Sequence, residues 1–565
     1  MFKYLFCGTF FCGAIVSLGS AHAQTPAPPP VDTSSYIRTP SAPSTPRING
    51  ADVYGERPSH PFLYHLPVTG DRPITYSAEN LPDGLTLDGA TGNITGSVKQ
   101  AGTFPVKFTA KNAQGQDSKT ISLVIGSTIC LTPPMGWNSW NCFGPRIDAG
   151  KIRSAADAMV KSGLIDHGWT YINMDDKWEG VRSPEGKIQG SENFPDMKGM
   201  ADYIHGLGLK VGLYSSPGPY TCAGAPGSYE HEDQDAQTYA EWGMDYLKYD
   251  WCSYDGVIHT RRAEKFAEAL PDFAANIKDL AAQMSVLKEK YRLTPNTNKP
   301  DIIQQRKDLE NQMKDINGKL EALYGHLDAH RGGAITLAEQ QAPYRLMRAS
   351  LNKVNRDIVY SFCQYGMGGV QTWGADAGGN TWRVTGDIRA IWPSVEAHGF
   401  KLKPGLAQWA NPGHWNDPDM LEVGNGDLTP DENYTHMTLW CMLTAPLLIG
   451  CDMTRMTPFT ISLFSNDEVL AVNQDRLGKQ GDRVKQDGTS EVWTKPLADG
   501  ALAVAFFNRG EVAADISVSW SELGLNGKQS VRDLWREKDL GTADTSYSVN
   551  VARHGAELFK ISPAK

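Results

Sequence analysis

Beyond residue 130, short apolar runs alternate with helix-length segments, and this alternation limits the possible folds more than any other feature of the chain. Eight runs have the length and composition of buried strands. They lie at 135–140, 171–174, 210–214, 245–249, 358–362, around 381–384, before 417 and at 447–450. Eight such strands with helices between them predict an α/β fold, a (β/α)8 TIM barrel. A doubly wound sheet also alternates, but it does not need polar residues after nearly every strand.

The run at 243–255 shows the arrangement most clearly. Its apolar and aromatic residues end at Asp250, and Lys248 lies two residues earlier, on the same side of the pleat. A lysine so near predicts an ionised Asp250, the state that a nucleophile or charge stabiliser needs. For a single strand, an aspartate that caps the next helix is the alternative.

Polar side chains also follow most of the other predicted strands. Carboxyl ends of barrel strands meet at one face, which is where barrel enzymes carry their chemistry. The sequence therefore predicts one site at that face, built from Lys248 and Asp250 together with Trp140, Asp175, Asp176, Tyr214, Cys363, Gln364, Arg383, Asp387, Asp417 and Asp419.

Segments of different character flank the predicted barrel at 128–475. Residues 24–46 are rich in Pro, Ser and Thr and predict a flexible or partly extended linker. Short alternating runs at 47–127 predict a small β-sandwich, and its segment 81–96 resembles immunoglobulin-like (Ig-like) domains of exported bacterial enzymes. Alternation returns at 476–565 and predicts a C-terminal antiparallel β-sandwich.

The N-terminus has the pattern of a signal peptide. Lys3 precedes an apolar stretch at 4–18, and a small-residue cleavage site at 21–23 predicts cleavage after Ala23. No later segment resembles a membrane span, so we expect a secreted or periplasmic protein. Seven cysteines remain, and an oxidising compartment permits a disulfide without choosing its partners. They are Cys130, Cys142, Cys222, Cys252, Cys363, Cys441 and Cys451.

A helical insertion interrupts the barrel pattern at 261–330. Two apolar repeats at helical spacing, separated by a Pro- and Asn-rich turn at 294–300, predict an antiparallel hairpin with a coiled-coil seam. A hairpin of this kind could cross the barrel mouth, dock a second subunit to give a homo-oligomer, or project into solvent. The predicted seam is formed by Phe273, Ile277, Leu280, Met284, Leu287, Tyr291, Ile302, Leu309, Met313, Ile316, Leu320, Leu323 and Leu327.

Charge and residue spacing narrow the possible chemistry. A net charge of -10 argues against nucleic acid or an anionic membrane as the main partner. Two carboxylates on different loops, Asp250 as nucleophile and Asp387 as an acid free to hold a raised pKa, suit a retaining glycosidase. The stretch at 416–419 looks like a metal loop, but no further ligands are spaced to complete it, so we expect neither a metal nor a cofactor.

Several motifs in order carry a family resemblance. The chain resembles glycoside hydrolase family 27, the α-galactosidases (melibiases) and α-N-acetylgalactosaminidases, from about 128 to 481 outside the insertion. The motifs are 133–140 (Pro-Pro-Met-Gly-Trp-Asn-Ser-Trp), 171–176 (Tyr-Ile-Asn-Met-Asp-Asp), 212–215 (Gly-Leu-Tyr-Ser), 220–228 (Tyr-Thr-Cys-Ala-Gly-Ala-Pro-Gly-Ser), 246–252 (Tyr-Leu-Lys-Tyr-Asp-Trp-Cys), 382–388 (Trp-Arg-Val-Thr-Gly-Asp-Ile), 415–421 (Trp-Asn-Asp-Pro-Asp-Met-Leu) and 472–475 (Val-Asn-Gln-Asp).

The resemblance implies roles for matching positions. Asp250 matches the nucleophile and Asp387 the acid/base, while Asp175 and Asp176 match the pair that holds the galactose 4- and 6-hydroxyls. Lys248 and Arg383 match charged residues around the sugar ring, and Trp140 and Tyr214 match aromatic walls of the pocket. Asp419 and Met420 match the pocket floor, and Cys222 with Cys252 matches a disulfide beside the nucleophile.

One departure from the family bears on specificity. Residues 364–366 read Gln-Tyr-Gly where many members have Glu-Trp after the cysteine, in the loop that faces the sugar's 2-substituent. Gln364 can still bind a hydroxyl, and Asp176 is retained, so we expect an exo-acting enzyme on α-galactosides. The alternatives are an α-N-acetylgalactosaminidase, a β-L-arabinopyranosidase, or a catalytically weak carbohydrate-binding protein.

Overall fold

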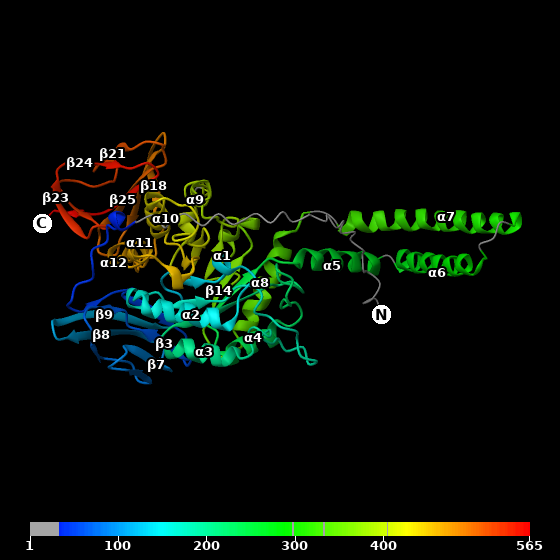
Figure 1. The fold of residues 1–565 in the computed structure, drawn as a ribbon, viewed down its shortest axis with the longest axis horizontal. Coiled ribbons are helices and arrows are strands. Elements are labelled where there is room, and N and C mark those ends of the chain that lie inside the picture. The colour runs from blue at the N-terminus through cyan, green and yellow to red at the C-terminus, as the bar shows by residue number, and fades with distance from the viewer. Residues whose placement is uncertain (1–32, 270, 296–298, 332–333, 404, 565) are drawn as a thin grey trace, which may run out of the picture.

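A parallel eight-stranded sheet forms the centre of the protein (Figure 1). The computed structural model describes residues 33–564 apart from 270, 296–298, 332–333 and 404. The strands follow the order β16-β15-β14-β13-β12-β11-β10-β17. Their bounds are β10 Met135–Asn138, β11 Tyr171–Asn173, β12 Lys210–Ser215, β13 Tyr246–Asp250, β14 Val359–Cys363, β15 Thr381–Arg383, β16 Trp415–Asp417 and β17 Leu447–Ile449.

The first and last strands of this order, β16 and β17, are also joined, so that the sheet closes into a barrel. Leu421, just after β16, forms a parallel bridge with Ile449 of β17. The Leu421 amide donates to the Leu448 carbonyl at 2.8 Å, and the Gly450 amide donates to the Leu421 carbonyl at 2.9 Å. The closed parallel sheet with its outer helices confirms the predicted (β/α)8 barrel.

Helices with well-defined starts surround the sheet. The side chains of Asp148, Thr336 and Thr429 accept hydrogen bonds from the first turns of α2, α8 and α10, and the two threonines complete capping boxes. The α-helices are α1 Trp140–Phe143, α2 Ala149–Lys161, α3 Met197–Gly206, α4 Glu232–Trp242, α8 Leu337–Leu351, α9 Trp392–Gly399, α10 Pro430–Met442, α11 Pro458–Phe464 and α12 Asp467–Asn473. Short 3-10 helices are η1 Ser34–Tyr36, η2 Leu164–His167, η3 Met367–Thr372, η4 Leu406–Trp409 and η5 Met453–Arg455.

The Ig-like region lies against the ends of the barrel where the strands begin. Lys210, the first residue of β12, donates to the Tyr54 hydroxyl at 2.6 Å, and the Arg57 amide donates to Asp357 at 2.7 Å. None of the described residues of this region lines the cavity at the opposite, carboxyl ends of the strands. The strands of the Ig-like region are β1 Arg47–Ile48, β2 Val53–Glu56, β3 Phe62–His65, β4 Val68–Thr69, β5 Thr75–Glu79, β6 Leu85–Leu87, β7 Asn93–Gly96, β8 Gly102–Asn112 and β9 Gly115–Ile125.

The chain after the barrel folds into antiparallel β-structure. A six-stranded sheet has the order β18-β19-β20-β25-β22-β23, and β21 pairs with β24. The apolar faces of these sheets enclose their own core. The strands are β18 Asp482–Asp487, β19 Ser490–Pro496, β20 Leu502–Asn508, β21 Ala514–Ser519, β22 Gln529–Asp533, β23 Lys538–Ala543, β24 Ser546–Val551 and β25 Ala556–Pro563.

The predicted linker is held in place over its described part. Arg38 forms an ion pair with Asp431 at 3.1 Å and another with Glu557 at 3.2 Å, and its guanidinium lies 4.1 Å from the centre of the Tyr434 ring. These contacts join the barrel to the C-terminal sandwich and hold this part of the segment in place, which its composition did not indicate. The predicted signal peptide at 1–23 lies outside the described residues.

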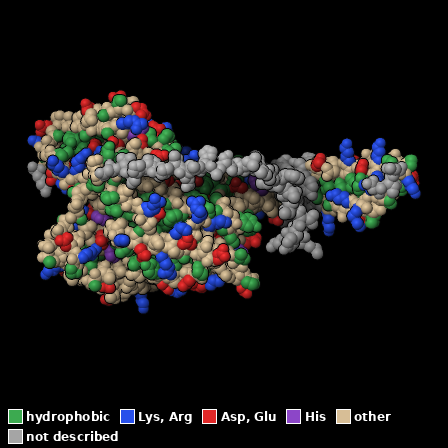
Figure 2. Space-filling model, viewed as in Figure 1, with side chains coloured by type: hydrophobic (Ala, Val, Ile, Leu, Met, Phe, Trp, Pro, Cys, Tyr) green, Lys and Arg blue, Asp and Glu red, His purple; other side chains and the backbone are tan. Residues whose placement is uncertain are grey.

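Two long helices project away from the body (Figure 1). After β13 the chain forms α5 (Tyr254–Ala269), α6 (Pro271–Leu293) and α7 (Pro300–Arg331) before it returns through α8. The seam between α6 and α7 buries Leu287, Leu309, Ile316 and Leu320, while charged side chains cover much of the outer surface (Figure 2). The predicted hairpin is therefore present. The side chains predicted for the seam at positions 273 and 327 lie outside the described part.

No helix in the described ranges is both long enough and apolar enough to cross a membrane.

Candidate active site

A cavity of about 480 Å³ opens at the carboxyl ends of the barrel strands, as the sequence predicted. Most of the predicted site residues meet there, although they come from strands far apart in the sequence. The lining residues are Trp140, Asn141, Asp175, Asp176, Tyr214, Cys222, Lys248, Asp250, Tyr365, Arg383, Asp387, Ile388, Arg389, Ala390, Asp419, Met420, Glu422, Asn425 and Gly426.

Asp250 ends β13 and is almost fully buried, with 5% of its surface exposed. The Tyr214 hydroxyl donates to its Oδ2 at 3.0 Å. Its Oδ1 has no partner of ordinary hydrogen-bond geometry among the described residues, although the Tyr365 hydroxyl is near enough to lower the pKa of the carboxyl. Burial raises the pKa of Asp250, and the charge of Lys248 and the two tyrosine hydroxyls offset only part of this effect.

The partner of Lys248 differs from the one expected. Its Nζ binds Asp175 Oδ2 at 2.8 Å, and the Asn138 amide donates to the same oxygen at 2.9 Å. Burial lowers the pKa of Lys248, but the neighbouring acidic groups, Asp175 first and Asp250 among them, together raise it above its usual value, so the lysine keeps its charge. Lys248 therefore acts on Asp250 through the electric field of its charge, which does not by itself cancel the rise in the pKa of Asp250 that burial causes.

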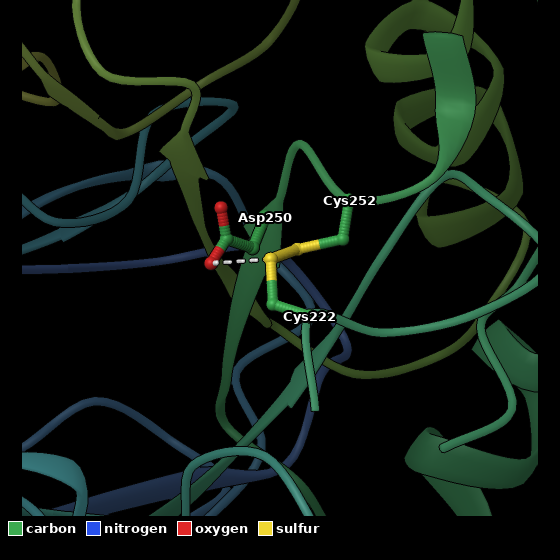
Figure 3. A group of neighbouring side chains, drawn as sticks. All are labelled: Cys222, Asp250 and Cys252. Atoms are coloured by element: carbon green, nitrogen blue, oxygen red, sulfur yellow. Dashed lines mark hydrogen bonds between the residues drawn. A yellow bond between two sulfur atoms is a disulfide. The ribbon is translucent and has the colours of Figure 1, made fainter. Parts of the chain in front are cut away.

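A disulfide-bonded loop holds Asp176. The Thr221 hydroxyl donates to Asp176 Oδ1 at 2.8 Å, and the Ala223 amide donates to Oδ2 at 2.7 Å. Between these two residues, Cys222 is joined to Cys252, the pairing that the family resemblance implied, and their Cα atoms are 5.1 Å apart. Figure 3 shows the disulfide beside Asp250, with Cys222 Sγ 4.0 Å from Asp250 Oδ2. The disulfide thus links the loop that binds Asp176 to the chain just after Asp250.

Arg383 connects the carboxylates on the other side of the cavity. It is buried, and it forms ion pairs with Asp387 and Asp419, both at 3.0 Å. The Asp387 side chain is 73% exposed, whereas that of Asp419 is only 9% exposed. Asp419 has a left-handed φ of 91° and accepts from the Ile388 amide at 2.8 Å, which ties the loop after β16 to the loop that carries Asp387.

Gln364 is the predicted substrate-binding residue that lies apart from the cavity. It is 2% exposed, and its Oε1 accepts a hydrogen bond from the Gly366 amide of its own loop at 2.8 Å. Tyr365 lines the cavity instead, with a left-handed φ of 59°. This backbone conformation directs the side chain of Tyr365, rather than that of Gln364, toward Asp250.

Sequence reasoning also missed the wall formed by Asn141, Arg389, Glu422 and Asn425. Asn141 and Glu422 directly follow motifs that carry the family resemblance, and Arg389 lies two residues after Asp387. Their position beside predicted site residues was a usable signal, but their residue types alone point to no reaction.

The described residues include one group of side chains spaced closely enough to hold a metal ion: Cys222, Asp250 and Cys252. Its two sulfur atoms are joined in the disulfide, so neither is a thiolate ligand. The donor set therefore does not fit a metal centre.

This arrangement suits acid–base and nucleophilic chemistry at one carbon atom. Asp250 is a buried carboxylate with one hydrogen-bonded oxygen, and Asp387 is an exposed carboxylate on a different loop. Asp175 and Asp176 are further carboxylates able to bind neighbouring hydroxyls.

Comparisons with known proteins agree with this geometry. A melibiase family model described as Alpha galactosidase A matches residues 132–317 and 315–475, an α-galactosidase C-terminal β-sandwich model matches 487–561, and an Ig-domain model matches 29–126. Alpha-galactosidase 2 of Arabidopsis thaliana is 36% identical over 449 residues, which are 78% of this chain and 92% of that protein.

Solved structures extend the likeness to the whole fold. A Bacteroides fragilis protein described as an α-galactosidase/melibiase matches with a TM-score of 0.76 and 32% identity, over 94% of this chain and all of that one. The α-galactosidase of Saccharomyces cerevisiae, solved with raffinose, matches with a TM-score of 0.58 and 25% identity, over 77% of this chain and 98% of that one. The chain thus belongs to the α-galactosidase (melibiase) family and is a glycoside hydrolase.

Proposed function

We propose that this protein is an exported, retaining exo-α-galactosidase that removes terminal α-D-galactosyl residues from oligosaccharides or polysaccharides. The observation that carries the mechanism is the state of Asp250. One of its oxygens is held by Tyr214, the other has no well-formed hydrogen bond among the described residues, and the exposed Asp387 lines the same cavity. A nucleophile and a separate acid/base are what double displacement requires.

In the first step, Asp250 Oδ1 attacks the anomeric carbon while Asp387 donates a proton to the departing oxygen. The Tyr214 hydroxyl on Oδ2 fixes the carboxylate plane, so that the free oxygen keeps its direction during attack. Arg383, paired with Asp387 at 3.0 Å, orients the acid. The product of this step is a galactosyl ester of Asp250.

In the second step, Asp387 acts as a base. It removes a proton from water, which attacks the anomeric carbon and releases Asp250. Two inversions at the same carbon give net retention.

Substrate preference follows from the carboxylates deep in the cavity. Both Asp175 and Asp176 are at most 2% exposed, and hydrogen bonds from neighbouring groups fix their orientation. Adjacent carboxylates held this way suit two neighbouring hydroxyls, as on C4 and C6 of galactose. The N-terminal pattern at 1–23 and the disulfide beside the site support export.

The test is hydrolysis of p-nitrophenyl α-galactopyranoside, with the α-N-acetylgalactosaminide and the β-L-arabinopyranoside run beside it. We expect rapid release from the galactoside alone, and proton NMR of the first product should show α-galactose. Asp250→Asn should abolish turnover, whereas Asp255→Asn, the same change at an exposed position on the next turn of chain, should keep it. Release from an analogue alone, β-galactose as the first product, or an active Asp250→Asn enzyme would each contradict the proposal.

A further inference from the structure

The cavity continues beyond the residues that would hold a galactosyl ring. Its deep end is buried: Asp175, Asp250 and Arg383 are at most 5% exposed. Its outer end lies around the exposed Asp387 and Arg389. In the proposed reaction Asp387 donates a proton to the departing oxygen, so the group attached to that oxygen must lie at the outer end.

Two loops form the wall of this outer end. The loop after β15 carries Arg389 and Ala390, and the loop after β16 carries Glu422, Asn425 and Gly426. The loops touch, because a Cβ atom on Gly426 would lie only 2.6 Å from the Ala390 side chain. The wall is therefore a packed surface, and Gly426 keeps the two loops in contact.

A buried carboxylate orients the polar groups of the wall. Glu422 is 3% exposed and accepts hydrogen bonds from the amides of Asn141 and Asn425, the latter at 2.8 Å. Since each Nδ2 donates to Glu422, each Oδ1 remains an acceptor without a hydrogen-bond partner in the described part of the chain. The His436 ring in turn accepts from the Glu422 amide at 2.9 Å. Glu422 is thus held from both sides.

Arg389 supplies the matching donors. Its guanidinium makes no hydrogen bond or ion pair with any described residue, although carboxylates surround the cavity. A sugar hydroxyl both donates and accepts, and so it matches a wall that combines two amide acceptors with a five-donor guanidinium. A solvated surface arginine beside two structural asparagines is the simpler alternative, and it predicts no effect on substrate choice.

We propose that Asn141, Arg389 and Asn425, oriented by Glu422, form a binding subsite for the sugar residue to which the terminal galactose is attached. This proposal rests on the proposed function and adds to it the residues that make the enzyme prefer a sugar, rather than an apolar group, as the leaving group.

The test compares kcat/KM for melibiose, whose leaving group is glucose, with kcat/KM for p-nitrophenyl α-galactopyranoside, whose leaving group is an aromatic ring without hydroxyls. We expect Arg389→Ala to lower the melibiose-to-aryl ratio about tenfold or more, since a hydrogen bond from a charged donor contributes at least that factor. Asn425→Ala should lower the ratio in the same direction by a smaller factor. The matched control is Arg455→Ala, an exposed arginine outside the cavity, which should leave the ratio unchanged.

Each outcome separates the subsite from the proposed function. If the wild-type enzyme hydrolyses both substrates and Arg389→Ala and Asn425→Ala leave the ratio at its wild-type value, the subsite is wrong and the α-galactosidase activity stands. Equal losses on both substrates would also refute the subsite, because they would indicate a general effect on the site. If the wild-type enzyme hydrolyses neither substrate, the proposed function fails and the subsite fails with it.

Discussion

Removal of one oxygen atom, the Tyr214 hydroxyl, should shift the pH dependence of catalysis. In Tyr214→Phe the ring remains in place, 1% exposed and with Lys248 Nζ 5.2 Å from its centre, while Asp250 Oδ2 loses its 3.0 Å hydrogen bond. Burial already raises the pKa of Asp250, and the lost donor stabilised the ionised form, so the pKa should rise further. The nucleophile must be ionised, and the acid limb of kcat/KM should therefore move to higher pH.

The size of this effect follows from the type of bond. A hydrogen bond to a charged group contributes about 1.5–3 kcal/mol, which corresponds to a loss of about 10- to 100-fold in kcat/KM on the acid side of the optimum. The assay is the pH profile of kcat/KM on p-nitrophenyl α-galactopyranoside. Tyr360→Phe is the matched control, because that buried hydroxyl binds the Tyr344 carbonyl at 3.3 Å outside the cavity. Superimposable profiles for Tyr214→Phe and the wild type would refute this role of the hydroxyl.

Three further predictions follow from other contacts. Replacing Cys222 and Cys252 together by serine should lower the Tm and the activity, since the closed loop of 30 residues accounts for about 3–4 kcal/mol of stability; unchanged melting curves would contradict this. Burial lowers the pKa of Lys495 to about 7, below its unfolded value, so the unfolded chain binds the extra proton between about pH 7 and 10. The wild type should thus lose stability relative to Lys495→Met as the pH falls from 10 to 7, and a Tm difference independent of pH would exclude this. EDTA should leave the initial rate unchanged, and loss of activity restored by a divalent cation would overturn the metal-free mechanism.

The barrel and most of its site could be predicted because both depend on local patterns. Each strand reads as a short apolar run, and the polar residue that ends it lies at the same face in every (β/α)8 barrel. This rule places Asp250 and Asp175 at the site, and it places Asp387 on a loop that follows another strand to the same face. The ion pairs between these residues were harder to predict: Lys248 is two residues from Asp250, yet it binds Asp175, which lies just after β11, two strands away in the sheet. Such a choice depends on side-chain reach across the barrel.

Loop conformation set the other limit. The sequence indicated that 364–366 faces the substrate, but it could not show that the left-handed φ at Tyr365 would bring that side chain into the cavity and leave Gln364 buried. Likewise, the composition of 24–46 gave no sign that Arg38 would form ion pairs with residues almost 400 and more than 500 positions away. Long-range partners of this kind leave no local pattern.

The projecting hairpin has a consequence for how the protein behaves in solution. With 32 residues, α7 is about 48 Å long at 1.5 Å per residue, and it extends away from the body together with α6 (Figure 1). Such an arm increases hydrodynamic drag far more than it increases mass. A single chain should therefore elute early from a size-exclusion column and diffuse slowly, and can be mistaken for a dimer, whereas light scattering, which measures mass, should report one copy unless a true assembly forms.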